Sequence, residues 1–272
     1  MQLQNAKSRF EAQGIKLAAI SYDSRAILKE FADRLKIDYP LLSDIESAVI
    51  RRFHVLNEKA AGINAGMALP GFFYIDTAGV IREKYFEASY ADRFTPNNVI
   101  AKLFPELTEE VTGKVEAPHL EVELAQSDQT VIQGSRFNVT VEVQLPPDMH
   151  VYAPGVKGYK PFQLTVQPSA DIRLASSTYP SAKLLYLEAI KEQVPVFEGK
   201  FRIVQDIKIT ASRQMTESLE ATGGKIIRVT GDLKYQACDM TICYPPASVP
   251  VSWELQVLPE DERRSPEAIR HK

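Results

Sequence analysis

Residues 137–145 read Phe-Asn-Val-Thr-Val-Glu-Val-Gln-Leu, so that every second side chain is apolar. In a β-strand this period of two places all the apolar side chains on one face. The same alternation recurs in three other runs, at residues 120–124, 201–209 and 249–257. Prolines and glycines separate the runs and none of them has a helical period, which predicts an all-β antiparallel sandwich over residues 118–258.

Residues 1–104 alternate instead between helix and strand signals. Ser24, Ser43 and Thr95 are expected to be the N-caps of three helices. An apolar β-hairpin is expected at residues 71–86. Strands and helices that follow one another in this way predict an α/β sheet layer for the first domain.

Two stretches are predicted to lie outside the domains. Residues 105–117 are polar and acidic, which is typical of a linker. Residues 259–272 are charged and are expected to form a frayed tail. The predicted domains are therefore residues 1–104 and residues 118–258.

The composition is that of an ordinary globular protein, and 272 residues are enough for two domains. The net charge of −3 lacks the basic footprint of a nucleic-acid-binding protein. No apolar run approaches the roughly 18–20 residues of a membrane span. We therefore expect neither a nucleic-acid partner nor a membrane span in this chain.

The two cysteines of the chain are Cys238 and Cys243, with four residues between them. This gap has the length of a hairpin loop, so the two Cα atoms can come within the roughly 4.4–6.8 Å that a disulfide needs. A disulfide that closes so short a loop removes little chain entropy, which favours a redox pair over a structural cross-link. The neighbouring carboxylate of Asp239 is expected to raise the pKa of the Cys238 thiol, and Lys234 is the one cation nearby in sequence.

Two other interpretations of the cysteines remain open. They can be two inert, buried thiols. They can also belong to a metal-handling module together with His150, although a closed zinc site needs a second cysteine pair or clustered histidines. The sequence predicts no metal and no cofactor.

Residues 15–104 resemble the redoxin family (AhpC/TSA), which has a thioredoxin-like fold. Three segments carry the resemblance: 17–24, 39–44 and 69–76 with Gly79. It implies that Pro70 is the cis-proline beside the family's active site, the alternative being an ordinary trans proline that enters a strand.

The family's reactive cysteine lies at the start of the first helix, and this chain has no cysteine before Cys238. The chain is therefore expected to begin inside that helix, as an incomplete domain that lacks the preceding strand and the peroxidatic thiol. Peroxidase activity is not expected of the chain as it stands, because that chemistry needs the thiolate.

Residues 118–258 resemble the N-terminal domain of thiol:disulfide interchange protein DsbD, an immunoglobulin-like sandwich. The resemblance rests on four short segments: 149–152, 197–200, 235–238 and 243–246. It departs from the family in two ways, because the gap between the cysteines is one residue shorter and Pro195-Val196 replaces the acidic residues before the cap aromatic.

The resemblance implies roles for six residues of this chain. Cys238 and Cys243 would be the exchanging pair and Phe197 the aromatic that caps them. The expected site-lining residues are Tyr152, His150 and Tyr235. For Phe197, Tyr152 and His150 the alternative role is ordinary packing at strand ends.

These resemblances imply a thiol–disulfide oxidoreductase whose partner is a protein thiol or disulfide. A partner thiolate would attack one sulfur of the pair, a mixed disulfide would form, and the second cysteine would resolve it. The alternative is a non-catalytic interaction protein with an inactive thioredoxin-like domain. The likeness to DsbD points to an extracytoplasmic or periplasmic location, whereas the first seven residues have no apolar core of a signal peptide.

Overall fold

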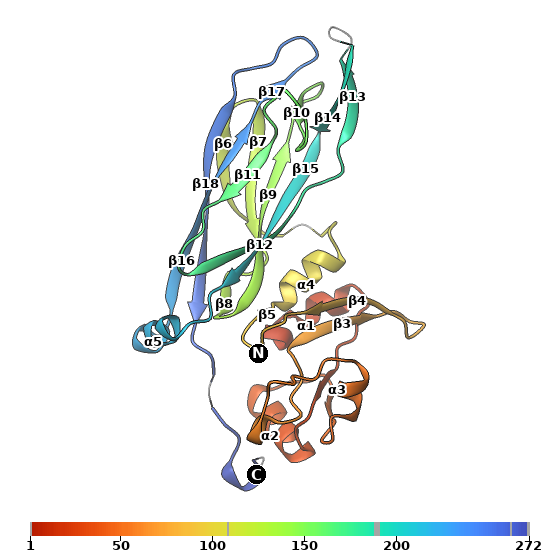
Figure 1. Cartoon of the computed structure of the whole chain (residues 1–272), viewed down its shortest axis with the longest axis vertical. Coiled ribbons are helices and arrows are strands. Elements are labelled where there is room, and N and C mark those ends of the chain that lie inside the picture. Colours follow the sequence, from red (N-terminus) through yellow and green to blue (C-terminus); the bar gives the residue numbers. More distant parts are fainter. Residues whose placement is uncertain (1, 108, 188–190, 262, 271–272) are drawn as a thin grey trace. The chain divides into compact units, whose positions relative to one another are not determined.

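The computed structural model describes residues 2–107, 109–187, 191–261 and 263–270. The chain divides into two compact units, Met1–Pro105 with Glu260–Lys272, and Glu106–Pro259 (Figure 1). Parts of the predicted segments lie outside the described residues, namely Met1 of the first domain, Thr108 of the linker, residues 188–190 of the sandwich domain, and residues 262, 271 and 272 of the tail.

The first unit is mixed α/β, as the sequence predicts. Strands β1 and β2 pair in parallel, and strands β3 and β4 pair antiparallel. Its elements are α1 Gln2–Ala12, β1 Ala19–Ser21, α2 Arg25–Leu35, β2 Leu41–Ser43, α3 Ala48–Arg52, a 3₁₀ helix Gly62–Asn64, β3 Gly71–Ile75, β4 Ile81–Phe86, β5 Arg93–Phe94, α4 Pro96–Leu103 and a second 3₁₀ helix Glu267–Ile269.

Two of the three predicted N-caps are confirmed. The side chains of Ser24 and Thr95 accept hydrogen bonds from the backbone N–H groups three residues later, at the starts of α2 and α4. Ser43 is not a cap, because it stays in strand β2, paired with Ser21. The carboxylate of Asp44 instead accepts from the first turn of α3, and that helix begins at Ala48.

The cis peptide bond predicted at Pro70 is absent. No described peptide bond is cis, so the Leu69–Pro70 bond is trans. Pro70 immediately precedes strand β3, where a trans proline enters the strand and the trans form is favoured by about 0.5–1 kcal/mol.

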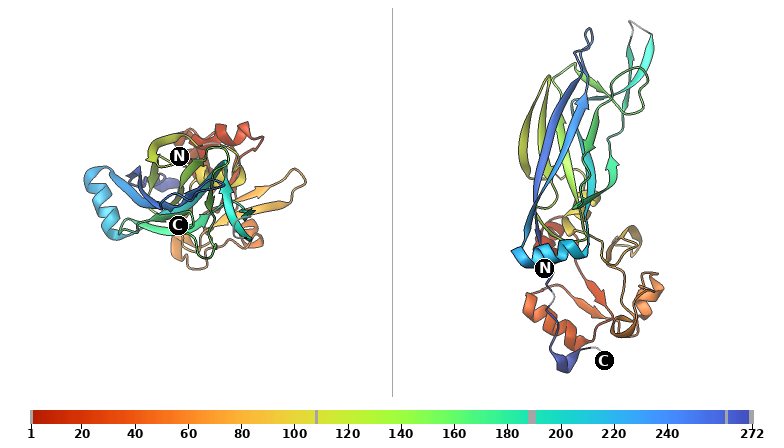
Figure 2. Two further views of the ribbon diagram at one scale, coloured as in Figure 1. Left: turned by 90° about the horizontal axis from the view of Figure 1, so that it is seen from above. Right: turned by 60° about the vertical axis from the view of Figure 1, so that its left-hand side comes forward.

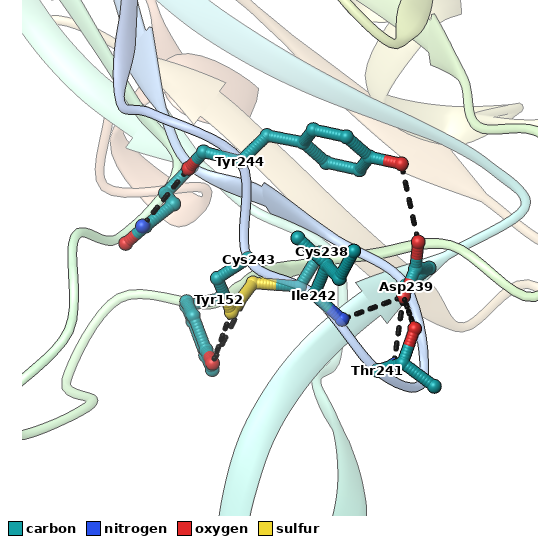
Figure 3. The surroundings of a disulfide bond; sticks show 8 residues. Tyr152, Cys238, Asp239, Thr241, Ile242, Cys243 and Tyr244 are labelled. Atoms are coloured by element: carbon teal, nitrogen blue, oxygen red, sulfur yellow. Dashed lines mark hydrogen bonds between the residues drawn. A yellow bond between two sulfur atoms is a disulfide. The ribbon is translucent and has the colours of Figure 1, made fainter.

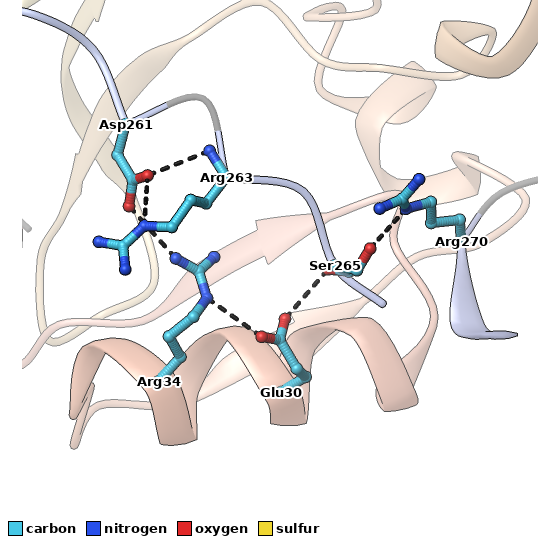
Figure 4. Close-up of polar contacts among 6 residues, drawn as sticks. All are labelled: Glu30, Arg34, Asp261, Arg263, Ser265 and Arg270. Atoms are coloured by element: carbon cyan, nitrogen blue, oxygen red, sulfur yellow. Dashed lines mark hydrogen bonds and ion pairs between the residues drawn. The ribbon is translucent and has the colours of Figure 1, made fainter. Parts of the chain in front are cut away.

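The predicted frayed tail is also wrong for the part that the structure describes, because polar contacts hold it against α2 (Figure 4). Arg34 lies 3.2 Å from Asp261 and 3.1 Å from Glu30. The hydroxyl of Ser265 donates to the other oxygen of Glu30 over 3.1 Å. Charged residues thus order this segment through tertiary pairing, which composition alone does not reveal.

The second unit is largely β, as predicted, and its sheets are seen from two sides in Figure 2. The strand orders are β12-β15-β9-β7-β6, β11-β16-β18-β8 and β13-β14-β10-β17. Its elements are β6 Val111–Ala117, β7 Leu120–Gln126, β8 Thr130–Ile132, β9 Ser135–Gln144, β10 His150–Tyr152, β11 Gln163–Val166, β12 Ile172–Thr178, β13 Lys183–Leu187, β14 Glu192–Glu198, β15 Lys200–Ile209, α5 Arg213–Thr222, β16 Lys225–Tyr235, β17 Ala237–Cys238 and β18 Ala247–Leu258.

The predicted alternating faces meet in one core. Strand β18 buries every second side chain, whereas β9 buries both its apolar face and the polar residues 138, 140 and 142 of the other face. Phe137, Val141 and Trp253 are each at most 2% exposed. Most of this core comes from the sheets that contain β9 and β18, and Val151, Phe197 and Ala237 of the third sheet also join it. The sandwich inferred from period-two alternation is therefore the arrangement observed.

Two details of the second unit differ from the prediction. The linker contains strand β6, which pairs antiparallel with β7 along its length and carries a Lys114–Glu123 ion pair of 2.7 Å. Its glycine and charged residues hide its β-character, and pairing with a neighbour overrides weak propensity. The unit is also not all-β, because α5 begins at a Ser212 cap and buries Met215 and Leu219.

Candidate redox site

Cys238 and Cys243 are joined by a disulfide, and their Cα atoms are 4.1 Å apart (Figure 3). The backbone explains the approach, because Asp239 N–H donates to the carbonyl of Ile242 and Tyr244 N–H donates to that of Ala237, each over 2.9 Å. These bonds flank the cysteines, which therefore occupy a non-hydrogen-bonded position of an antiparallel pair, where facing side chains are closest. The expectation that a tight β-loop brings the sulfurs together is confirmed.

Asp239 closes the loop between the cysteines. Its Oδ1 accepts hydrogen bonds from the backbone N–H groups of Thr241 and Ile242, each over 2.7 Å, and from the Thr241 hydroxyl. Its Oδ2 accepts from the Tyr244 hydroxyl at 3.1 Å. The hydrogen bonds from Thr241 and Ile242 lower the pKa of Asp239 to about 2.

The amides of Thr241 and Ile242 are expected to report this ionisation. Because the pKa of Asp239 is lower in the folded protein than its ordinary value of 3.8, its contribution to stability is full above pH 3.8 and is lost as the pH falls towards 2. In an acid titration followed by NMR, both amide signals should shift with a midpoint near pH 2, and Asp239→Ala should remove this shift. A midpoint near 3.8 would show that the bonds do not form in solution.

The two sulfurs differ in exposure. Cys238 is 0% exposed and pairs with β10, whereas Cys243 is exposed. Attack on a disulfide requires a thiolate to reach one sulfur. A protein thiol that approaches from solvent therefore meets Cys243, and Cys238 is the buried member of the pair.

Tyr152 lies against both sulfurs. Its hydroxyl oxygen is 3.5 Å from Cys243 Sγ and 3.7 Å from Cys238 Sγ, and it is the donor because a disulfide sulfur carries no hydrogen. The ring is buried and stacks on that of Tyr159, with centroids 4.4 Å apart. Burial raises the pKa of Tyr152, which keeps the phenol protonated.

Apolar side chains surround Cys238. Val194 and Val196 of β14 form one buried cluster with Cys238 and Tyr152. Other apolar side chains pack against this cluster, namely Val156, Tyr159, Leu185 and Leu187. Sequence reasoning missed the hairpin of β13 and β14, because residues 183–187 do not alternate and give no signal of the face they cover.

Phe197 does not cap the disulfide, contrary to the prediction. It follows Val196 along β14 and so faces the other side of the sheet. There it is 4% exposed in the main core, with its ring 4.9 Å from that of Phe201. Tyr235 is likewise a core residue, since its hydroxyl donates to the carbonyl of Pro118 over 2.9 Å and burial raises its pKa to about 12.

The site offers little to a metal ion. Among the described residues, no group of three or more His, Cys, Asp or Glu side chains is placed to hold one. Within the same part of the chain, no helix has the length and apolar character needed to cross a membrane.

Part of each unit matches the model of a known protein family. Residues 1–84 match the model of the AhpC/TSA family. Residues 119–252 match the model described as thiol:disulfide interchange protein DsbD, N-terminal, whose domain is an immunoglobulin-like sandwich. Both predicted resemblances are thus confirmed, and no curated protein matches the chain.

Solved structures similar to this chain are N-terminal domains of the same kind. The N-terminal periplasmic domain of ScsB from Proteus mirabilis is 15% identical over 56% of this chain, with a TM-score of 0.34, and the match spans only 53% of that domain's length. The reduced DsbD N-terminal domain of Neisseria meningitidis is 14% identical, with 58% of this chain and 98% of that domain covered and a TM-score of 0.32. A structure of the complex between the DsbD and PilB N-terminal domains from the same organism matches at 16% identity. The match covers 52% of this chain and 85% of the chain in that structure, with a TM-score of 0.30.

Proposed function

We propose that this protein exchanges electrons with a partner protein's cysteines through the Cys238–Cys243 disulfide. The observation that carries the proposal is the asymmetry of the pair, since Cys243 is an exposed residue and Cys238 a buried one, with a phenol donor beside both sulfurs. The match of residues 119–252 to the DsbD N-terminal model supports the same class of chemistry. A protein thiol is the expected partner, because Cys243 is an exposed residue at the base of a surface loop.

The reaction begins at Cys243. A partner thiolate attacks its Sγ, the Cys238–Cys243 bond breaks, and its electron pair leaves with Cys238 as a thiolate. The Tyr152 hydroxyl, 3.7 Å from Cys238 Sγ, is placed to donate a hydrogen bond to this charge. A second partner thiolate then attacks the partner sulfur of the mixed disulfide, which releases Cys243 and an oxidised partner. The same steps in reverse oxidise the dithiol form of this protein.

The first unit is proposed to be a thioredoxin-like domain that lacks one strand of its sheet. The support is the match of residues 1–84 to the AhpC/TSA model. In addition, the paired strands β1–β2 and β3–β4 form separate sheets, and β1 and β3 line one apolar cavity of about 420 Å³.

Counting thiols in the native protein tests the proposed exchange. The oxidised protein should present no thiol, and a mild dithiol should expose both, with full recovery of the disulfide on reoxidation. A buried structural cross-link would instead resist reduction until the protein is unfolded. The non-catalytic alternative predicts thiols that stay free and unreactive in the native state.

A further inference from the structure

Four chemically active side chains lie in one row across the sheet β13-β14-β10-β17 and the adjoining Cys238–Cys243 bridge. His150 of β10 is directly opposite Glu198 of β14 on one side and Cys238 of β17 on the other, and Cys238 is opposite Cys243. Side chains of directly opposed residues point to the same face of a sheet, with Cβ atoms about 4.5–5.5 Å apart. The order on this face is therefore the carboxylate of Glu198, the imidazole of His150, the buried Cys238 and the exposed Cys243.

His150 is a buried residue with an unused nitrogen. It is 2% exposed, and its Nε2 has no hydrogen-bond partner among the described residues. Its ring stands edge-on to Tyr152, 5.6 Å between centroids. Buried polar atoms are nearly always paired, so an orphaned imidazole nitrogen beside a reactive cysteine calls for an explanation.

We propose that His150 is the general base for Cys238, with Glu198 as the residue that positions and stabilises its protonated form. The proposal rests on the proposed exchange function and concerns the step in which the buried cysteine reacts. Tyr152 contacts both sulfurs as a hydrogen-bond donor, whereas His150 lies opposite Cys238 alone.

The step is balanced without any further reactant. With a mixed disulfide on Cys243, the neutral imidazole takes the proton of the Cys238 thiol. The resulting thiolate attacks Cys243 Sγ, the Cys238–Cys243 bond forms, and the partner leaves with the electron pair of the broken bond. The imidazolium passes its proton to water or to the departing thiolate. In the reverse direction the imidazolium protonates Cys238 as it leaves.

The charges around His150 suit both of its states. Burial lowers the pKa of its imidazole, while Glu198 and Asp239 oppose the shift, so the ring is neutral at pH 7 and able to accept a proton. Glu198 also pairs with Lys183 over 3.2 Å. Tyr152, whose ring stands edge-on to that of His150, stays a neutral phenol because burial raises its pKa.

The step can be observed with a bis(nitrothiobenzoate) disulfide reagent added to the reduced full chain in a stopped-flow instrument. Exposed Cys243 attacks first and releases one nitrothiobenzoate. Cys238 then attacks the mixed disulfide and releases the second. The first phase checks folding and the exchange function, and the second isolates the reaction of Cys238.

The variants are His150→Gln, His150→Leu and Glu198→Gln, with His54→Gln as the control because His54 is an exposed histidine of the other unit. Both His150 variants should keep the first phase and slow the second by about 10²-fold, the lower end of general-base catalysis. In the pH profile of the second phase, they should also remove the ionisation below pH 6.5 that belongs to the His150 imidazole. Glu198→Gln should move that ionisation to lower pH, because it removes a charge that favours the imidazolium.

A second phase that keeps its rate and pH profile in His150→Gln would overturn the proposal, since glutamine fills the space but cannot accept the proton. If the unaltered chain releases no nitrothiobenzoate at all, the exchange function itself fails. A normal first phase combined with an unaffected second phase in the His150 variants leaves the exchange function standing and removes only the role of His150.

Discussion

The Cys238→Ser protein is expected to capture one nitrothiobenzoate on Cys243 and to hold it. Cys243 remains exposed and can attack the reagent, but the thiol that would resolve the mixed disulfide is gone. The parent chain, treated in the same way in its reduced form, should release both nitrothiobenzoates and retain none. Mass spectrometry of the intact protein after removal of free reagent measures the difference directly.

Cys243→Ser is the matched control, because it keeps the same count of thiols but leaves the buried one. Cys238 is 0% exposed within its apolar cluster, so the native variant should resist the reagent. It should react fully once unfolded in guanidinium chloride. Equal reactivity of the two native variants would contradict the burial asymmetry on which the direction of attack depends.

The disulfide was predictable because it depends on local geometry. Four intervening residues suit a β-loop, and such a loop places the two sulfurs in reach. Asp239 illustrates the limit of the same reasoning. The sequence shows a carboxylate beside Cys238, whereas the structure shows that this carboxylate is committed to the loop backbone.

Phe197 shows why the surroundings of the sulfurs were harder to predict. Successive residues of β14 face opposite sides of the sheet, so a shift of the strand by one residue would move Phe197 to the other face. Because Val194, Val196 and Phe197 are all apolar, composition does not distinguish the face of the disulfide from that of the main core. Register with β10 decides it, and that pairing is non-local.

The row of Glu198, His150 and Cys238 is a stronger case of the same limit. It depends on the register of three strands that are far apart in sequence. The sequence therefore indicated His150 only through the resemblance at residues 149–152, and it did not indicate that this histidine lies next to Cys238. By contrast, the alternation of β18 predicted its buried face, since the strand carries its own period, whereas the polar face of β9 is buried as well and its sequence did not indicate this.

Strand β16 provides a stringent test of the predicted faces, because two consecutive isoleucines in it face opposite sides of the sheet. Ile227 is 4% exposed in the main core, opposite Leu255 of β18, whereas Ile226 is 69% exposed. Replacing Ile227 with alanine should lower the free energy of unfolding by about 2–5 kcal/mol, through lost burial and the cavity left behind. The same replacement at Ile226 should change it by no more than about 0.5 kcal/mol.

Trp253, the one tryptophan of the chain, reports this unfolding from inside the second unit, where it is 2% exposed. Its fluorescence in urea therefore follows the sandwich and not the first unit. Both substitutions replace isoleucine with alanine, so the difference between the two losses of unfolding free energy reports only on which face of β16 is buried. Equal losses at the two positions, or a larger loss at Ile226, would mean that β16 is out of register by one residue, which would also change the faces presented by the strands paired with it.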